Sequence, residues 1–116
     1  MALGAVGSMR AGLERAAPRI RGQAARRVYA WHATREEAGA ALTCQTLRRF
    51  VMGADAVREV TMAKLATQRA SFELHDALLS LLGPDPELER AARDSRLGPI
   101  GGGTDEIMKE ILGRVL

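Results

Sequence analysis

DSRLGPIGGGTDEIMKE, the stretch from Asp94 to Glu110, marks the end of one helix, a glycine-rich turn and the start of a last helix. The glycines at 101–103 allow backbone angles and close approaches that side chains would forbid. Thr104 is a natural N-cap, because its hydroxyl can accept hydrogen bonds from the free amides of the first turn. Asp105 and Glu106 then suit the positive end of the helix dipole. Such a helix start can bind an anion, although a plain turn explains the same glycines.

The composition favours a small all-helical domain. The chain has 116 residues, of which 47% are hydrophobic and only 3% aromatic. Alanine is frequent, and alanine favours helices over sheets. No apolar run approaches the roughly 18 residues that a membrane-spanning helix needs, so we expect no membrane span. These features together predict one domain with a core of packed helices.

Cys44 is the only cysteine, so no internal disulfide can form, and a reducing cytoplasm is the expected location. No neighbouring residue would activate its thiol, and Cys44 is therefore predicted to be a small buried residue. The first 27 residues are rich in arginine and nearly free of acids, as mitochondrial transit peptides are. They contain a single serine, and we interpret them as part of the fold. The mitochondrial matrix is the alternative location.

Positive charge is concentrated in the first half of the chain. The formal net charge is +3, yet residues 1–50 carry nine arginines against three glutamates. A basic half that also contains Tyr29 and Trp31 could indicate nucleic-acid binding. The arginines are scattered, however, and two aromatic residues are too few for a stacking platform. We therefore expect no nucleic-acid partner.

Apolar periodicity and helix-breaking residues divide the chain into helices. Pro18 ends the first helix, Gly53 closes the second, and Asp55 can cap the third. Pro86 fits the first position of a brief helix after the turn at 83–86. The predicted helices span residues 2–17, 24–52, Asp55 to about 82 and 86–93, with a last helix after Thr104.

The expected architecture is an all-α, antiparallel four-helix bundle. The third helix should be central, since the leucines between 74 and 82 make it apolar nearly all round. We expect the apolar stripe of the second helix to be Val28, Trp31, Ala38, Leu42, Leu47, Phe50 and Val51. On the third and last helices we expect burial of Leu65, Phe72, Leu79, Ile107 and Ile111.

Two histidines could carry chemistry. His32 and Glu36 lie one helical turn apart, which would suit two ligands of a metal ion. A third ligand is missing, and we interpret the pair as a polar contact on the helix surface. His75 lies in a leucine-rich helix, where a hydrogen-bonded core histidine is a better interpretation than a buried base. We expect no metal site.

Taken whole, the stretch 94–110 resembles the C-terminal domain of flavin-dependent acyl-CoA dehydrogenases. That family commonly has Asp-Ala-Arg, a spacer, Ile-Tyr-Glu-Gly-Thr or Ile-Tyr-Gly-Gly-Thr, and then Asn/Ser-Glu-Ile. Ala63-Lys64 resembles an Ala-Lys pair early in the preceding long helix of the family, and residues 3–7 resemble its opening helix. The resemblance implies one C-terminal-type helical domain over residues 1–116, without the family's N-terminal helical and middle β domains.

The resemblance also implies a cofactor and site residues. These enzymes remove the α-hydrogen of an acyl-CoA with a glutamate base and pass the β-hydrogen as hydride to FAD. By resemblance, Gly103 contacts substrate, whereas Thr104, Asp105 and Glu106 line the phosphate or adenine side of the flavin. Gly102 stands at the usual base position and cannot act as a base. The family's second base position would precede Met1 by a few residues, so neither base is expected in this chain.

Three functions follow as hypotheses. The first is the C-terminal portion of a flavin-dependent acyl-CoA dehydrogenase that is inactive without further polypeptide, with FAD binding weak or absent in the isolated chain. The second is a non-catalytic assembly module, which would form a homo-oligomer or associate with a full-length acyl-CoA dehydrogenase-type subunit. The third is a basic helical binding protein.

Overall fold

The computed structural model describes residues 2–98, 100 and 104–116. Helices account for nearly all of the regular structure in this part of the chain, and it contains no strand, which confirms the all-α prediction. Each predicted helix is present, with ends close to those expected from the sequence. The elements are α1 (Ala2–Ala16), a short 3-10 helix η1 (Ala17–Arg19), α2 (Gln23–Val51), α3 (Val57–Leu82), α4 (Pro86–Ser95) and α5 (Asp105–Val115).

Local signals explain where the helices begin and end. Gly22, Gly53 and Gly83 all have positive φ and stand where one helix gives way to the next, a backbone conformation that side chains disfavour. Asp85 caps α4 by accepting hydrogen bonds from the amides of the next turn. The predicted cap at Asp55 is wrong, because the N-cap of α3 is Ala56, which makes no side-chain cap hydrogen bond. Asp55, one residue earlier, accepts a hydrogen bond of 3.1 Å from the Val57 amide.

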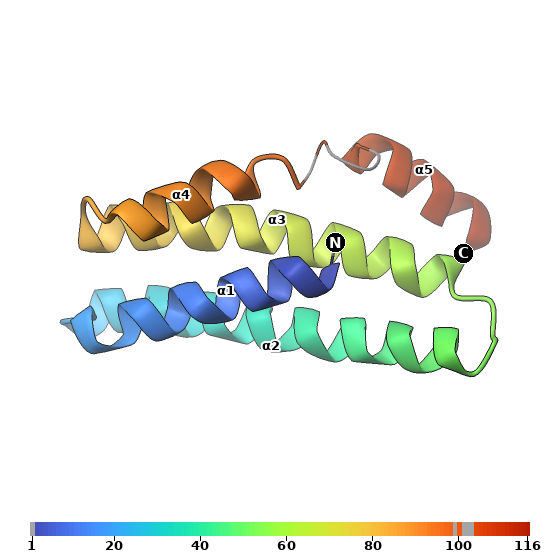
Figure 1. The fold of residues 1–116 in the computed structure, drawn as a ribbon, viewed down its shortest axis with the longest axis horizontal. Helices are drawn as coiled ribbons and strands as arrows, with labels where there is room; N and C mark the ends of the chain where they lie inside the picture. Colours follow the sequence, from blue (N-terminus) through green and yellow to red (C-terminus); the bar gives the residue numbers. More distant parts are fainter. Residues whose placement is uncertain (1, 99, 101–103) are drawn as a thin grey trace.

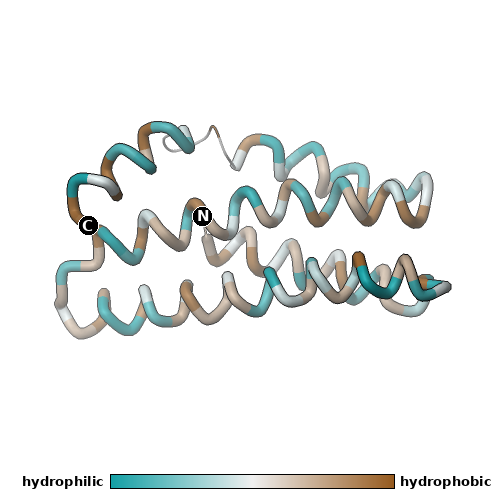
Figure 2. The backbone as a smooth tube through the Cα atoms, turned by 180° about the vertical axis from the view of Figure 1, so that it is seen from behind, coloured by the Kyte–Doolittle hydropathy of each residue, from teal (hydrophilic) through white to brown (hydrophobic). Residues whose placement is uncertain are grey.

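The helices form an antiparallel bundle whose columns differ in length (Figure 1). With 29 residues, α2 is about 43 Å long, close to the 44 Å long axis of the molecule, and α3 has a similar length. Along α3, α4 and α5 lie end to end and together form another full column. The 15 residues of α1 span only about 22 Å. Hydrophilic and hydrophobic segments alternate along the helices, as expected for amphipathic elements (Figure 2).

Because α1 is short, the bundle has two unlike halves. In the closed half, α1 and α4 pack together with the adjoining parts of α2 and α3. In the open half, the C-terminal part of α2, the N-terminal part of α3 and α5 have no fourth column beside them. The apolar core lies in the closed half; its buried members are Val6, Met9, Leu13, Ala16, Ile20, Ala70, Leu74, Leu78 and Leu88.

The predicted core stripe of α2 is wrong. Trp31 is 59% exposed and Val51 is 82% exposed, and both Leu47 and Phe50 are also on the surface. The face of α2 that packs against its neighbours is instead polar or small: its members are His32, Glu36, Gly39, Thr43 and Thr46. Small and hydrogen-bonded residues allow these helices to approach closely, since the Thr43 and Thr46 hydroxyls donate to the carbonyls of Gly39 and Leu42.

Other burial predictions had mixed outcomes. The central position of α3 is confirmed, because Leu74 and Leu78 have no exposed surface. The expected burial of Ile107 is wrong, since its side chain is 50% exposed, and Leu65, Phe72, Leu79 and Ile111 are only half-buried. Cys44 is exposed rather than buried, because α2 turns it away from α1 and α3. No helix among the described residues is both long and apolar enough to cross a membrane.

Candidate functional site

Two side chains of α3 hold the two ends of the loop that precedes α5. The Lys64 ammonium donates to the Gly98 carbonyl over 3.3 Å, before the glycine run. After the run, the Arg69 guanidinium donates to Asp105 Oδ2 over 3.0 Å. The two cations are one to two helical turns apart on one helix, so a single rigid element fixes both ends of the loop. Gly98 itself is buried, and a Cβ at that position would lie only 2.0 Å from Gln68 Oε1.

The head of α5 is built from three residues that the sequence singled out. The Thr104 hydroxyl accepts a hydrogen bond of 3.3 Å from the Ile107 amide, which confirms the predicted N-cap. Asp105 is buried against Arg69, and its Oδ1 accepts no hydrogen bond from any residue that the structure describes. Glu106 is exposed. Gly102 and Gly103, predicted to stand at the base position and to contact substrate, lie outside the described residues.

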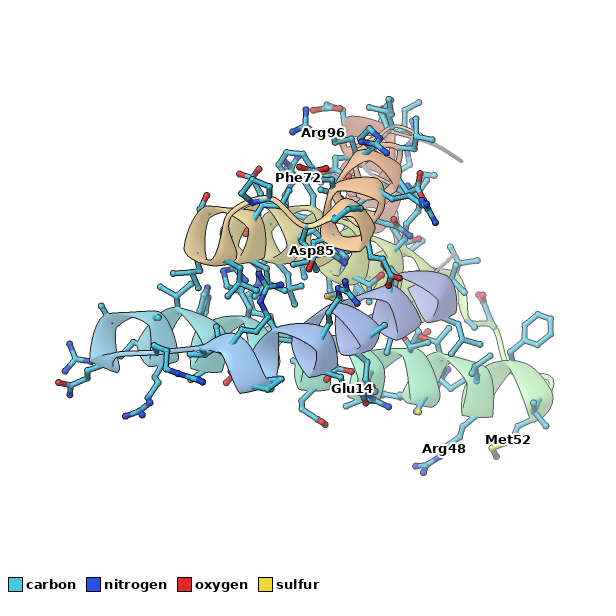
Figure 3. The ribbon with its side chains drawn as sticks, turned by 60° about the vertical axis from the view of Figure 1, so that its left-hand side comes forward. Glu14, Arg48, Met52, Phe72, Asp85 and Arg96 are labelled. Atoms are coloured by element: carbon cyan, nitrogen blue, oxygen red, sulfur yellow. The ribbon has the colours of Figure 1, made fainter. Side chains whose placement is uncertain are left out.

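Phe72 supports this arrangement from the surface of α3. The guanidinium groups of Arg69 and Arg96 lie 5.9 and 5.8 Å from the centre of its ring. Figure 3 shows Phe72 and Arg96 close together where α4 ends. Cations at this distance are attracted to an aromatic ring. The same Arg69 that pairs with Asp105 is thus also fixed by Phe72, a role for which the sequence carries no local signal.

A second charged cluster lies at the far end of the closed half. The Arg15 Nε donates to both carboxylate oxygens of Asp85 at 3.0 Å, and Arg19 Nη1 donates to Oδ2 at 2.7 Å. Figure 3 shows Asp85 between α1 and the start of α4. The hydrogen bond from Arg15, together with the amides of α4, lowers the pKa of Asp85 to about 2. Sequence analysis missed this cluster, although an Asp directly before a Pro is a recognised helix-start signal.

His75 is the hydrogen-bonded core histidine that the sequence predicted. It has no exposed surface, and its Nδ1 donates to the Ser71 carbonyl over 2.7 Å. Its Nε2 lies 3.3 Å from the Ser8 hydroxyl, so the imidazole joins α3 to α1. A Cβ at Gly12 would approach this ring to 3.3 Å, which explains the small residue there. Ser8 lies inside α1, where the backbone amides are used in the hydrogen bonds of the helix, so the contact is structural.

The interpretation of His32 and Glu36 as a surface pair is wrong. Both side chains are buried between helices, and Glu36 Oε1 lies 2.7 Å from Arg10 Nη2 of α1 in an ion pair. His32 Nδ1 is buried, and no residue that the structure describes forms a hydrogen bond with it. The pKa of His32 is lowered, mainly because the side chain is buried and also because the positive charge of Arg35 lies nearby. Within the described residues no cluster of three or more candidate ligands could hold a metal ion.

Comparison with known proteins gives the family of this chain. The family model for the acyl-CoA dehydrogenase C-terminal domain matches residues 1–116. The chain belongs to this family. The chain is also similar to a solved structure from Mycobacterium abscessus, that of a probable acyl CoA dehydrogenase. The two share 28% sequence identity, and the TM-score is 0.91. That match covers 98% of this chain and 35% of the other, so the chain spans about a third of its relative's length. Among curated proteins none matches.

Two of the three motifs that carry the family resemblance are in contact in the structure. Lys64, from the Ala-Lys pair of α3, contacts the backbone of Gly98 in the stretch 94–110. Residues 3–7, the third resemblance, form the first turns of α1. Gly4 and Ala5 line one surface hollow with Ser71 of α3 and Asp94 of the stretch 94–110, so the three resemblances lie in one connected region along α3.

Proposed function

We propose that residues 1–116 form one domain, the C-terminal helical part of a flavin-dependent acyl-CoA dehydrogenase. The observation that carries this proposal is the anchoring of the glycine loop to α3 on both sides, by Lys64 before it and Arg69 after it. This anchoring places the N-terminus of α5 at a fixed position, as binding of an anionic cofactor group would require.

The head of α5 fits the phosphate or adenine side of FAD. The first amides of a helix carry partial positive charge, which favours a phosphate group. Two carboxylates in the first turn would oppose it, but the Asp105 side chain is turned to Arg69, which neutralises its charge. Thr104 and Glu106 then remain as the polar groups that can contact the cofactor, with Asp105 acting through its backbone. By family resemblance Gly103 would meet the acyl-CoA.

The chain as given should not dehydrogenate an acyl-CoA. FAD, when bound, accepts the hydride in this chemistry, but a base must remove the α-proton. Gly102 occupies the usual base position and has no side chain. We expect no electron transfer from any acyl-CoA to an artificial acceptor by the purified chain with added FAD. Steady turnover that depends on FAD would overturn this part of the proposal.

Cofactor binding is testable in the isolated chain. We expect FAD and ADP to bind no more tightly than about millimolar, because few contacts remain to offset the entropy lost on association. The amide signals of Thr104, Asp105 and Glu106 should shift during an NMR titration. Thr104→Ala should weaken the shifts, whereas Arg90→Ala on the exposed face of α4 serves as the control. Saturation at micromolar FAD, or shifts confined to other helices, would contradict this assignment.

Assembly through apolar surface is the second candidate. Leu47, Val51 and Met52 form an exposed apolar ridge near the end of α2, and Figure 3 shows Met52 and Arg48 projecting from this end. Such a ridge suits a helix–helix contact with a second copy or with a full-length acyl-CoA dehydrogenase-type subunit. Sedimentation of the chain should show self-association that Val51→Lys abolishes and Gln45→Lys, also on α2, leaves intact. A compact monomer at high concentration would count against the homo-oligomer.

A basic binding protein is the least supported of the three functions. Seven arginines are used in ion pairs, namely Arg10, Arg15, Arg19, Arg35, Arg49, Arg69 and Arg114. Paired cations contribute less to the affinity for a phosphate backbone, because fewer counterions are released on binding. We propose no nucleic-acid partner, and we retain the cytoplasm as the location, with the mitochondrial matrix as the alternative.

A further inference from the structure

A polar hollow lies on the surface between α2 and α3, near the turn that joins them. The two helices pack against each other and run side by side in Figure 1. The volume of the hollow is about 310 Å³. Residues three or four positions apart share a face of a helix, so each helix brings a short row of side chains to the hollow. The rows are Leu42, Gln45 and Arg49 from α2, and Arg58, Glu59 and Met62 from α3.

Arg49 is held in position by α3 and by the turn before it. Its Nε lies 3.2 Å from Glu59 Oε1 in an ion pair, and its Nη2 donates to the Asp55 carbonyl over 3.3 Å. The Glu59 side chain is only 14% exposed. A guanidinium has five N–H donors, so further donors remain for a ligand after these two contacts. Because the group is already fixed, less entropy is lost when a ligand uses it.

Arg58 and Gln45 supply further donors to the same hollow. Both side chains are exposed, and neither forms a hydrogen bond or an ion pair with any residue that the structure describes. Two guanidinium groups therefore share the hollow with one carboxylate, which Arg49 already occupies. The excess positive charge and the unused donors favour an anionic ligand.

The chemistry of the hollow favours a phosphate group over a carboxylate. The three free oxygens of a phosphate monoester can accept from both guanidinium groups and from the Gln45 amide at once, whereas a carboxylate has two oxygens. Leu42 and Met62 are half-buried and give the hollow an apolar part. Its volume is at the lower end of the range of about 300–1,000 Å³ that is typical of small-molecule sites, which leaves room for a substituent on the phosphate.

We propose that this hollow binds an organic phosphate monoester, with the phosphate held by Arg49 and Arg58 and the apolar substituent over Leu42 and Met62. The hollow shares no residue with the head of α5, so the proposal stands whether or not FAD binds there. The contacts are few and open to solvent, so a small phosphate monoester should bind with a dissociation constant of about 1 mM.

The test titrates the intact chain with phenyl phosphate at low ionic strength, where exposed charges are least screened. The NMR signals of the Arg49 and Arg58 Nε–H groups should shift. Arg58→Gln should weaken binding at least ~5-fold, because it removes a charge-assisted hydrogen bond. The matched control is Arg48→Gln, which removes the same charge from an exposed arginine of α2 outside the hollow and should leave the affinity unchanged.

Two further ligands test the parts of the proposal. Inorganic phosphate should bind more weakly than phenyl phosphate, and Met62→Ala should reduce this difference because it removes part of the apolar contact. Benzoate, a carboxylate with the same ring, should also bind more weakly. Equal affinities for benzoate and phenyl phosphate would overturn the assignment to a phosphate. Equal losses in Arg58→Gln and Arg48→Gln, or signals at Arg49 and Arg58 that do not shift, would overturn the site itself.

Discussion

The closed and open halves of this bundle use the same two long helices in different ways. In the closed half, α1 and α4 cover α3, and Leu74 and Leu78 have no contact with solvent. In the open half, the same α3 presents Val57 and Val60 to solvent beside an apolar groove. The difference shows that an apolar stripe on a helix is not buried merely because it is apolar. Burial depends on whether a further helix lies across the stripe.

The largest effect should come from an apolar deletion in the closed half. Leu74→Ala removes a side chain without exposed surface and should lower the free energy of unfolding by about 2–5 kcal/mol. The matched substitution Leu47→Ala, on the exposed end of α2, should cost less than about 1 kcal/mol. Urea denaturation of both variants measures the contrast. Equal losses would mean that the two halves are equally packed.

Asp85 holds the closed half together at its far end, and its loss should be the next largest effect. Asp85→Ala removes the cap of α4 and the carboxylate that Arg15 and Arg19 share, so the thermal midpoint should fall by several degrees.

The effect of Asp85 should depend on pH. Its pKa in the folded chain is about 2, against an ordinary value of 3.8. The stability it contributes is therefore complete above pH 3.8 and lost as the pH falls toward 2. Between pH 7 and 2, the thermal midpoint of the wild-type chain should approach that of Asp85→Ala. A constant gap across that range would contradict the role of the ionised carboxylate.

The junction between the halves should be more tolerant. A methyl group at Gly98 would lie 2.0 Å from the Gln68 Oε1, an atom at the end of its side chain, and 3.1 Å from the Gln68 Cβ. We expect Gly98→Ala to cost about 1 kcal/mol, within the usual range of single substitutions. Gln68→Ala in the same chain should recover part of the loss, since it removes the two nearest atoms, Oε1 and Cδ, and leaves Cβ. Strictly additive losses in urea denaturation would show that the two positions do not interact.

The smallest effect concerns His32, on the buried face of α2. Burial lowers its pKa below the ordinary 6.5, so the unfolded chain takes up a proton first as the pH falls. The stability associated with neutral His32 is present above pH 6.5 and declines as the pH drops toward the lowered value. His32→Gln should flatten this part of the stability profile. An unchanged profile would mean that a group other than His32 causes the pH dependence.

Helix positions could be predicted from the sequence because their signals are local. Pro18, Gly53, Pro86 and Thr104 each set a boundary through their own backbone or hydroxyl group. The buried face of α2 could not be predicted in this way. Glu36 looks like a surface residue until Arg10 of another helix is placed beside it.

The candidate site was predicted in part for the same reason. The cap at Thr104 is local and was found, and the family resemblance directed attention to Asp105. The partner of Asp105 is Arg69, which lies 36 residues away and has no sequence signal that distinguishes it from other arginines. Long-range pairs of this kind require the fold.

Hydrogen exchange along α3 tests the contrast between the halves most directly, because one continuous helix passes through both. We predict that the amides around Leu74 and Leu78 exchange only by unfolding of the whole chain, whereas those around Val60 and Thr61 exchange through local opening at least ten times faster. Uniform protection from Val60 to Leu78 would show that the open half is as stable as the closed one, and would contradict the account.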